Sequence, residues 1–389
     1  SAMGPIQDII TSTDDSSALT AAERAHLLVY SHAESPSNTL VAYSTNFGQV
    51  LLCNIHSANC SNDSVNADLT STNVSAVEPC LSPISIFKAN NFGIYCLATI
   101  ASSGDSSEHG FMAAGSANGV FGYSWTDLVN LDGYDASPAV RWRLDLSGGT
   151  ANSLASMSDG HQLIVACNDG CVKLYDLGHG GRLVRAWSFD DSSSNQSAAS
   201  VLRVTVGSSD SSSAVCSDEA GFVRFLDSRQ RSVRNSFQPA LAAPDSVARP
   251  YLGNWLTCLA CRPDTVDWFA CGGGPRLAIW HSANLIEPIA TIDWQPTDQF
   301  TPFCAEFSPC DRLLVGGNSS LVGQVSTVNG SLVSKTKLSC WQTMSIGCLG
   351  IGGDSGLSSV RDWRFTGCGL GSRIDVCSQL GYRLFSLSA

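Results

Sequence analysis

Short apolar runs that alternate with polar residues recur along the chain, and turns rich in Gly, Pro and Asp separate them. The clearest group spans residues 254–282, NWLTCLACRPDTVDWFACGGGPRLAIWHS. Its pattern predicts three short antiparallel strands, at 256–260, at 268–271 and in the run that ends at Trp280. A sheet of this size is not stable alone, so it must pack against copies of itself or against another layer.

Copies are present, and a glycine expected in the turn before the third strand marks each one. The marker residues are Gly48, Gly119, Gly170, Gly221, Gly274, Gly323 and Gly371. Successive markers lie 71, 51, 51, 53, 49 and 48 residues apart. A tight hairpin turn needs positive φ, which glycine adopts without steric cost. A strand-only repeat of about fifty residues is typical of propeller blades.

The sequence therefore predicts an all-β fold, a seven-bladed WD40-type β-propeller over residues 27–389. Third strands end in a degenerate Trp-Asp pattern, as at Leu226-Asp227 and Trp280-His281. A strand at 382–388, near the C-terminus, is expected to complete the last blade, so that no blade needs a strand from the N-terminus. Residues 1–26 are expected to form a tail and a short helix, from the pattern SALTAAERAHLL at 17–28. Polar segments at 57–80, 102–109 and 190–200 are expected to be inserted loops.

Composition indicates a globular protein, with 43% hydrophobic and 14% charged residues. No apolar run approaches the roughly 20 residues that cross a bilayer, so a soluble intracellular protein without membrane contact is expected. The sixteen cysteines mostly fall in predicted strands, where a free thiol packs as a small hydrophobic group. Cys258 and Cys261 form a CxxC pair, but no second pair follows at zinc spacing, so no metal is expected.

The net charge of −12 argues against direct nucleic-acid binding. Arginines nevertheless gather in the middle of the chain, where they form either a solvated rim or a patch for an acidic partner helix. They are Arg182, Arg185, Arg203, Arg224, Arg229, Arg231 and Arg234. From this group we predict Arg224, Arg229 and Arg231 as partner-binding residues.

No motif for catalysis, phosphate binding or a cofactor is present: GxSxG, HExxH and GxxxxGKS/T are all missing from the sequence. His281 occupies a position where WD40 blades hold Asp, and a structural hydrogen bond is the expected role. The protein is predicted not to be an enzyme, and no small-molecule substrate is expected. What remains is a binding platform. Exposed aromatic and Arg residues dominate interfaces, so the exposed members of Tyr251, Trp255, Arg276 and Trp280 are candidate anchors, with ordinary blade packing as the alternative.

Three segments resemble the THO complex subunit 6 family, and weaker likeness extends along the whole chain. They are WLTCLACRPDTVDWFACGGGPRLAIWH, the ending RIDVCSQLGYRLFSLS, and NTLVAYSTNFGQVLLCNI. The resemblance implies a WD40 subunit of the nuclear THO/TREX assembly, which couples transcription and splicing to mRNA processing and export. It implies contact with other THO subunits, coiled-coil ones included. The family carries over no catalytic or motif-defined binding residues.

Two alternatives stay open. The segment Leu226-Asp227-Ser228-Arg229 is similar to the WDxR box of substrate receptors for cullin-type ubiquitin ligases, although the Trp is missing. The other alternative is a ligand or enzyme site in the central channel, which requires converging polar residues or a metal. A channel lined only by apolar and small residues would argue against it.

Overall fold

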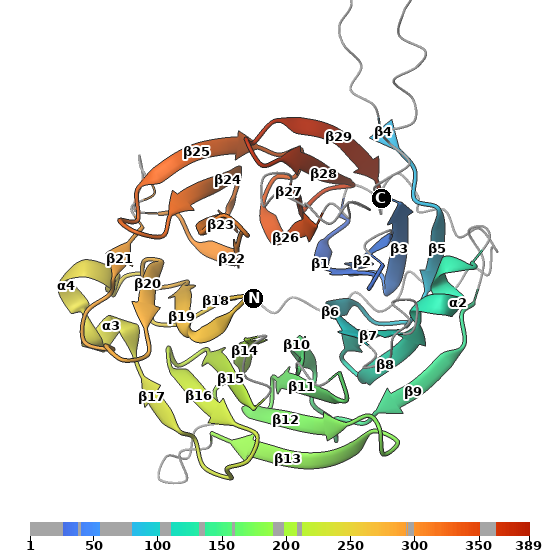
Figure 1. Cartoon of the computed structure of the whole chain (residues 1–389), viewed down its shortest axis with the longest axis horizontal. Helices are drawn as coiled ribbons and strands as arrows, with labels where there is room; N and C mark the ends of the chain where they lie inside the picture. The colour runs from blue at the N-terminus through green and yellow to red at the C-terminus, as the bar shows by residue number, and fades with distance from the viewer. Residues whose placement is uncertain are drawn as a thin grey trace, which may run out of the picture.

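The computed structural model describes residues 26–37, 40–54, 80–101, 110–131, 137–157, 160–189, 198–207, 212–292, 294, 299–350 and 363–389. Within these ranges the chain forms seven sheets, arranged as blades around a central opening (Figure 1). Each blade holds four strands in antiparallel sequence, ordered from the axis outward. The predicted seven-bladed all-β propeller is confirmed.

The first three blades follow the predicted order. Blade 1 contains β1 (Val29–Glu34), β2 (Leu40–Thr45), β3 (Gln49–Asn54) and β5 (Ser85–Lys88). Blade 2 contains β6 (Ile94–Ala101), β7 (Gly110–Ser116), β8 (Gly119–Ser124) and β9 (Val140–Leu144), with the short helix α2 (Trp125–Val129) after β8. Blade 3 contains β10 (Ala151–Ser156), β11 (Gln162–Cys167), β12 (Cys171–Asp176) and β13 (Arg182–Ser188).

Two short helices follow the fourth blade. Blade 4 contains β14 (Val201–Val206), β15 (Ser213–Asp218), β16 (Val223–Asp227) and β17 (Asn235–Phe237), and is followed by α3 (Pro239–Ala242) and α4 (Pro244–Val247). Blade 5 contains β18 (Cys258–Arg262), β19 (Thr265–Gly272), β20 (Ala278–His281) and β21 (Ala290–Thr291). Blade 6 contains β22 (Pro302–Phe307), β23 (Arg312–Gly317), β24 (Ser319–Ser326) and β25 (Leu332–Lys337). Blade 7 contains β26 (Thr343–Gly350), β27 (Trp363–Gly369), β28 (Arg373–Ser378) and β29 (Arg383–Ser388).

The hydrophobic core is divided into clusters that lie between neighbouring blades. One cluster joins Leu52 of blade 1 to Met112 of blade 2, and another joins Leu277 of blade 5 to Leu313 of blade 6. Middle strands are therefore covered on both faces, and every residue of β2 is buried. This explains why such strands read as continuous apolar runs rather than as strict alternation. Each blade is stabilised by its neighbours, so we expect the ring to unfold cooperatively.

The ring is closed by a strand that the sequence did not indicate. β4 (Cys80–Leu81) comes from the segment between β3 and β5, yet it pairs in parallel with β29 at the outer edge of blade 7 (Figure 1). Leu28 also forms a bridge to Leu370. Blade 7 has four strands of its own, the last of them the C-terminal β29 as predicted, and β4 is an additional fifth strand that the sequence did not indicate. These contacts join the N-terminal and C-terminal blades.

The marker glycines behave as predicted in most blades. Gly48, Gly170 and Gly221 have φ values of 76°, 76° and 88°. A Cβ on Gly48 would come within 2.1 Å of the Asn90 carbonyl oxygen, so no other residue fits there. Gly274 and Gly323 are exceptions, because neither has a positive φ, and Gly323 lies inside β24 rather than in the turn before it.

Most of the predicted N-terminal helix falls outside the described residues. Its last residues are not helical, because Leu28 forms a strand bridge and the Leu27 carbonyl accepts a hydrogen bond from the Gly371 amide at 2.9 Å. The loops expected at 57–80, 102–109 and 190–200 also lie largely outside the described residues, apart from Cys80 in β4 and 198–200. None of the helices among the described residues is long and apolar enough to cross a bilayer.

Candidate functional site

The ring has two different faces. Because each blade has four antiparallel strands, the chain enters and leaves a blade on the same face of the ring. We call this the connector face, since it carries the connections between blades and the turns between second and third strands. The opposite side is the hairpin face, which carries the other two turns of each blade. Partner contacts on these faces draw on different residues.

Three of the four predicted anchors of blade 5 lie toward the connector face, and the four differ in exposure. Tyr251 is 66% exposed. Trp255 is half-buried, and its indole Nε1 donates to the Leu252 carbonyl at 2.9 Å. Arg276 is half-buried and donates to the Ser246 carbonyl at 3.3 Å. Trp280 is a core residue instead of an exposed anchor, since it is 0% exposed and packs edge-on against Phe237.

The centre of this region is Arg249, which the sequence reasoning missed. Arg249 is 3% exposed, and its guanidinium donates to the carbonyls of Gly274, Gly273 and Phe300 at 2.8, 2.7 and 2.7 Å. A Cβ on Gly274 would meet a backbone oxygen at 2.1 Å, which explains the glycine run. Several charge-assisted hydrogen bonds satisfy this buried cation. An arginine in a Pro- and Ala-rich connection appears solvent-exposed from sequence, so only the fold reveals its role.

The predicted arginine group does not form one patch. Arg203 lies in the central channel and donates to the carbonyls of Thr257 and Phe303 at 3.0 and 3.3 Å. Arg224 forms an ion pair with Asp218, whose side chain is 0% exposed. Its guanidinium also lies 4.2 Å from the ring centroid of Phe189. Both arginines are held by internal contacts.

The other arginines remain closer to solvent. Arg229 is 73% exposed, although two of its nitrogens donate to the buried carboxylate of Asp227 at 2.9 Å each. Arg182, Arg231 and Arg234 are exposed, at the start of β13 and between β16 and β17. The positive charge available to a partner is therefore on the hairpin side of blades 3 and 4. Of the three predicted basic residues, Arg229 and Arg231 are accessible and Arg224 is not.

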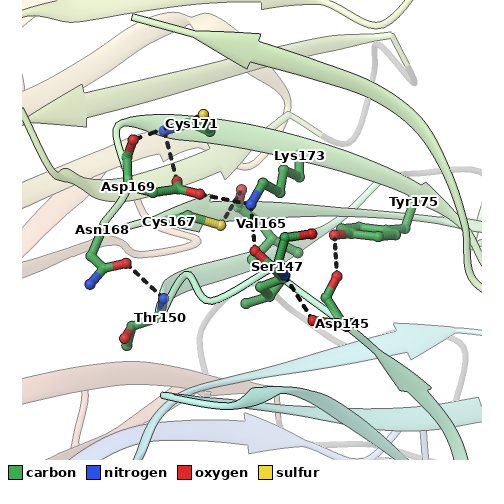
Figure 2. Close-up of polar contacts among 11 residues, drawn as sticks. Asp145, Ser147, Thr150, Val165, Cys167, Asn168, Asp169, Cys171, Lys173 and Tyr175 are labelled. Carbon is green, nitrogen blue, oxygen red and sulfur yellow. Dashed lines mark hydrogen bonds and ion pairs between the residues drawn. The ribbon is translucent and has the colours of Figure 1, made fainter. Parts of the chain in front are cut away.

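A polar network ties blade 3 to the connection that precedes it, as Figure 2 shows. Lys173, 8% exposed, donates to the Leu146 carbonyl at 2.7 Å and to Asp169 at 2.8 Å. The Tyr175 hydroxyl donates to the Asp145 carbonyl at 3.0 Å. Burial lowers the pKa of Lys173, but the hydrogen bond that Lys173 donates to Asp169 and the charge interactions with Cys167, Asp169 and Cys171 together outweigh it and leave the pKa raised. The network therefore fixes a connector loop and leaves Lys173 little freedom to bind a partner.

The channel is narrow but not purely apolar. It encloses a cavity of about 310 Å³ lined by the innermost strands, where Arg203 and Glu306 reach its wall together with small residues. Burial raises the pKa of Glu306 to about 7. Among the described residues no group of three or more His, Cys, Asp or Glu side chains could hold a metal ion. The channel lining therefore includes charged side chains as well as apolar and small residues. A lining of apolar and small residues alone would have argued against a channel ligand, so this alternative stays open.

The cysteines inside strands are free and mostly buried, as predicted for packing residues. Burial raises the pKa of Cys216 and of Cys258 to about 12, so these thiols stay protonated and are poor nucleophiles at neutral pH. Cys258 and Cys261 are both free thiols on β18. His281 takes the expected structural role, since its Nδ1 accepts from the Ala283 amide at 3.1 Å.

Comparison with known proteins identifies relatives over almost the whole chain. No protein-family profile matches it. The human protein THO complex subunit 6 is 24% identical over 373 residues, which cover 95% of this chain and 94% of the human protein. The zebrafish THO complex subunit 6 homolog is 24% identical over 374 residues, covering 94% of this chain and 98% of the relative. The chain is similar to THO complex subunit 6. The resemblance predicted from three segments is confirmed.

The aligned length matters more than the identity here. A match that covers both chains nearly end to end includes all seven blades, not one repeat that any propeller might share. The mouse THO complex subunit 6 homolog is also 24% identical, over 95% of this chain. The similarity to THO complex subunit 6 therefore extends over the whole ring and includes both faces.

Proposed function

We propose that this chain is a non-catalytic WD40 scaffold subunit of a nuclear THO/TREX complex, which supports mRNA processing and export by binding other THO subunits. The observation that carries the proposal is the end-to-end similarity to THO complex subunit 6. A subunit of a complex must offer surface to other chains, and the ring of seven interlocked blades presents two faces and an outer rim.

The chemistry of the ring favours binding over catalysis. The most buried polar groups, such as Arg249 and Asp218, are engaged with the protein's own carbonyls and side chains. The net charge of −12 disfavours direct contact with phosphate backbones. The partners we propose are protein subunits, with no membrane, small-molecule substrate or direct nucleic acid. Coiled-coil subunits are included among them because the resemblance to THO complex subunit 6 implies them.

The test is affinity purification of the tagged full chain from nuclear extract, followed by mass spectrometry. We expect THO subunits to co-purify in near-stoichiometric amounts and to remain after nuclease treatment, because the contacts are between proteins. Absence of THO subunits from the purified material would overturn the proposal. Loss of the same subunits after nuclease treatment would show that nucleic acid carries the contact.

A second candidate function rests on one local observation. Arg229 is held by the buried Asp227 carboxylate yet is 73% exposed, so the turn after β16 presents a fixed, exposed guanidinium. If residues 226–229 act as a WDxR box, Arg229 must be exposed to the adaptor, and its exposure meets this requirement. A cullin adaptor recovered in the same purification without THO subunits would support a ubiquitin-ligase substrate receptor instead.

A further inference from the structure

A groove opens on the hairpin face between blades 5 and 6, away from every residue predicted as an anchor. Its volume is about 580 Å³. Trp268 of β19 and Ile289, just before β21, contribute from blade 5, whereas Val328 and Val333 contribute from the outer part of blade 6. The groove is therefore built from two blades and exists only in the assembled ring.

The wall of this groove is apolar and accessible. Val328 is 81% exposed, Val333 49% and Ile289 39%. Trp268 is half-buried, with its ring 5.4 Å from that of His281 in an edge-on arrangement. Single exposed apolar residues are ordinary on any protein surface, but several that converge on one concavity indicate a binding site.

At the rim of the groove, the acidic side chains are more exposed to solvent than the basic ones. The side chains of Asp264 and Asp311 are 69% and 68% exposed, whereas that of Arg262 is only 29% exposed. Arg312, the other arginine of the groove lining, is half-buried and donates to the Gln324 side chain at 3.1 Å. Arg262 lies 5.7 Å from the centroid of the Trp268 ring and is paired with both carboxylates, at 3.4 and 2.6 Å. Glu287, also exposed, is two residues from Ile289. A ligand that approaches from solvent therefore meets carboxylates outside and an apolar wall inside.

We propose that this groove binds an extended segment of a partner protein in which one large aliphatic or aromatic side chain is flanked by Lys or Arg residues. The apolar side chain would enter between Trp268 and Val328, and the flanking cations would lie near Asp264 and Asp311. The volume is within the range of about 300 to 1,000 Å³ that is typical of ligand sites. Acidic rim charges select a basic segment over an acidic one. The proposal specifies how the proposed scaffold holds a partner, and rests on that function.

The groove can be tested with the purified full-length chain and a defined probe. The probe is a fluorescein-labelled peptide, SGKKLKKGS, whose binding is followed by fluorescence anisotropy at low and at physiological salt. Matched peptides replace the central Leu by Ser, or the four Lys by Glu. We expect saturable binding of the first peptide and at least fivefold weaker binding of the other two. Equal binding of the Glu peptide, or no saturable binding of the Lys peptide, would overturn the proposal.

Variants locate the binding to the groove. Replacing Val328→Ser together with Val333→Ser removes apolar wall without adding charge, and should weaken peptide binding at least fivefold. The matched control is Leu380→Ser, because Leu380 is 67% exposed in the corresponding hairpin turn of blade 7, outside the groove. The control should bind within twofold of the wild type. An equal loss in the control would place binding elsewhere and overturn the proposal.

Two further readouts separate the remaining outcomes. Cys310 is exposed in the groove lining and is not in a disulfide, so bound peptide should slow its alkylation by iodoacetamide, as mapped by mass spectrometry. Concentration-dependent dimerisation of the wild type that the double Ser variant abolishes would identify a second copy of this chain as the occupant, and would overturn the proposal. Peptide binding uses the isolated protein, so it can fail while THO subunits still co-purify, and the reverse also holds.

Discussion

The two faces of blade 5 and its surroundings contain similar residue types in opposite roles. On the connector face, Arg249 and Arg276 donate hydrogen bonds to backbone carbonyls of neighbouring connections, and Trp255 donates one within its own loop. On the hairpin face, Trp268 contributes to the wall of a groove whose neighbours are exposed Ile289 and Val328. The aromatic and cationic groups of the first face are largely engaged inside the protein, and the groove of the second is open to a partner.

This difference shows that residue type alone does not locate an interface. Aromatic and Arg residues are frequent binding anchors because they offer large area and directional hydrogen bonds. The same properties let them stabilise connections inside a protein. Exposure and the absence of competing internal contacts decide between the two roles, and Tyr251, 66% exposed, is the connector-face residue that retains the larger accessible area.

The largest effect on stability is expected from Arg249, the most buried of the connector-face arginines. Arg249→Met should lower the free energy of unfolding by about 3 kcal/mol or more, because it leaves several buried carbonyls without donors. Thermal unfolding followed by circular dichroism measures the change. Arg231→Met, at an exposed position, is the matched control and should stay within about 0.5 kcal/mol of the wild type. Equal melting temperatures for both variants would contradict a structural role for Arg249.

Between the two faces, the channel offers a test by pH. Burial raises the pKa of Glu306 to about 7, whereas the pKa of a glutamate in the unfolded chain is about 4.3. The folded state therefore binds this proton more tightly, and the stability from it is present below about pH 4 and is lost as the pH rises to about 7. Glu306→Gln should be more stable than the wild type at pH 8, by about 2 kcal/mol, and similar to it at pH 4.5.

Melting temperatures of the two proteins across this pH range provide the measurement. Glu219→Gln, at an exposed position, is the control for replacing a glutamate by glutamine. A Glu306→Gln variant that is less stable than the wild type at pH 8 would mean that the carboxylate makes a favourable contact in the channel.

A moderate effect should distinguish the two faces in partner capture. The double variant Val328→Ser and Val333→Ser should reduce captured THO subunits about fivefold, or about 1 kcal/mol, whereas Tyr251→Ser should change capture less than twofold. Quantitative mass spectrometry of purified complexes measures both. Greater loss with Tyr251→Ser would assign the main contact to the connector face.

The smallest effect is expected from the exposed arginines. Reversing the charge at Arg231 and Arg234, which are both exposed, should weaken capture of an acidic partner about threefold, with the loss greatest at low salt, because rim charges act mainly on association. Arg224 and Arg229 are not suitable positions, since their reversal would break ion pairs with the buried carboxylates of Asp218 and Asp227. Capture that is unchanged at low salt would exclude a basic binding patch on blades 3 and 4.

The sequence predicted those parts of the molecule that local chemistry determines. The period of the turns, the positive φ of Gly48 or Gly170 and the C-terminal strand of blade 7 each follow from a few neighbouring residues. It did not predict β4, whose two residues pair with β29 from the opposite end of the chain. This pairing forms only because blade 1 and blade 7 meet in the closed ring, so no local sequence pattern indicates it.

Site residues were harder to predict for the same reason. Trp280 was a candidate anchor because of its type, but its burial depends on Phe237 of the preceding blade. Arg249 lies in the connection between blades 4 and 5, and its carbonyl partners are up to 51 residues away. The groove requires Trp268 and Val328 from different blades. None of these contacts has a signature within one repeat.

The most direct measurement is hydroxyl-radical footprinting of the chain, free and bound to the subunits that it captures from nuclear extract. We expect oxidation of Val328 and Val333 to fall on binding, and oxidation of Tyr251 to stay at the level of the free chain. Protection of Tyr251 with Val328 and Val333 unchanged would contradict this expectation.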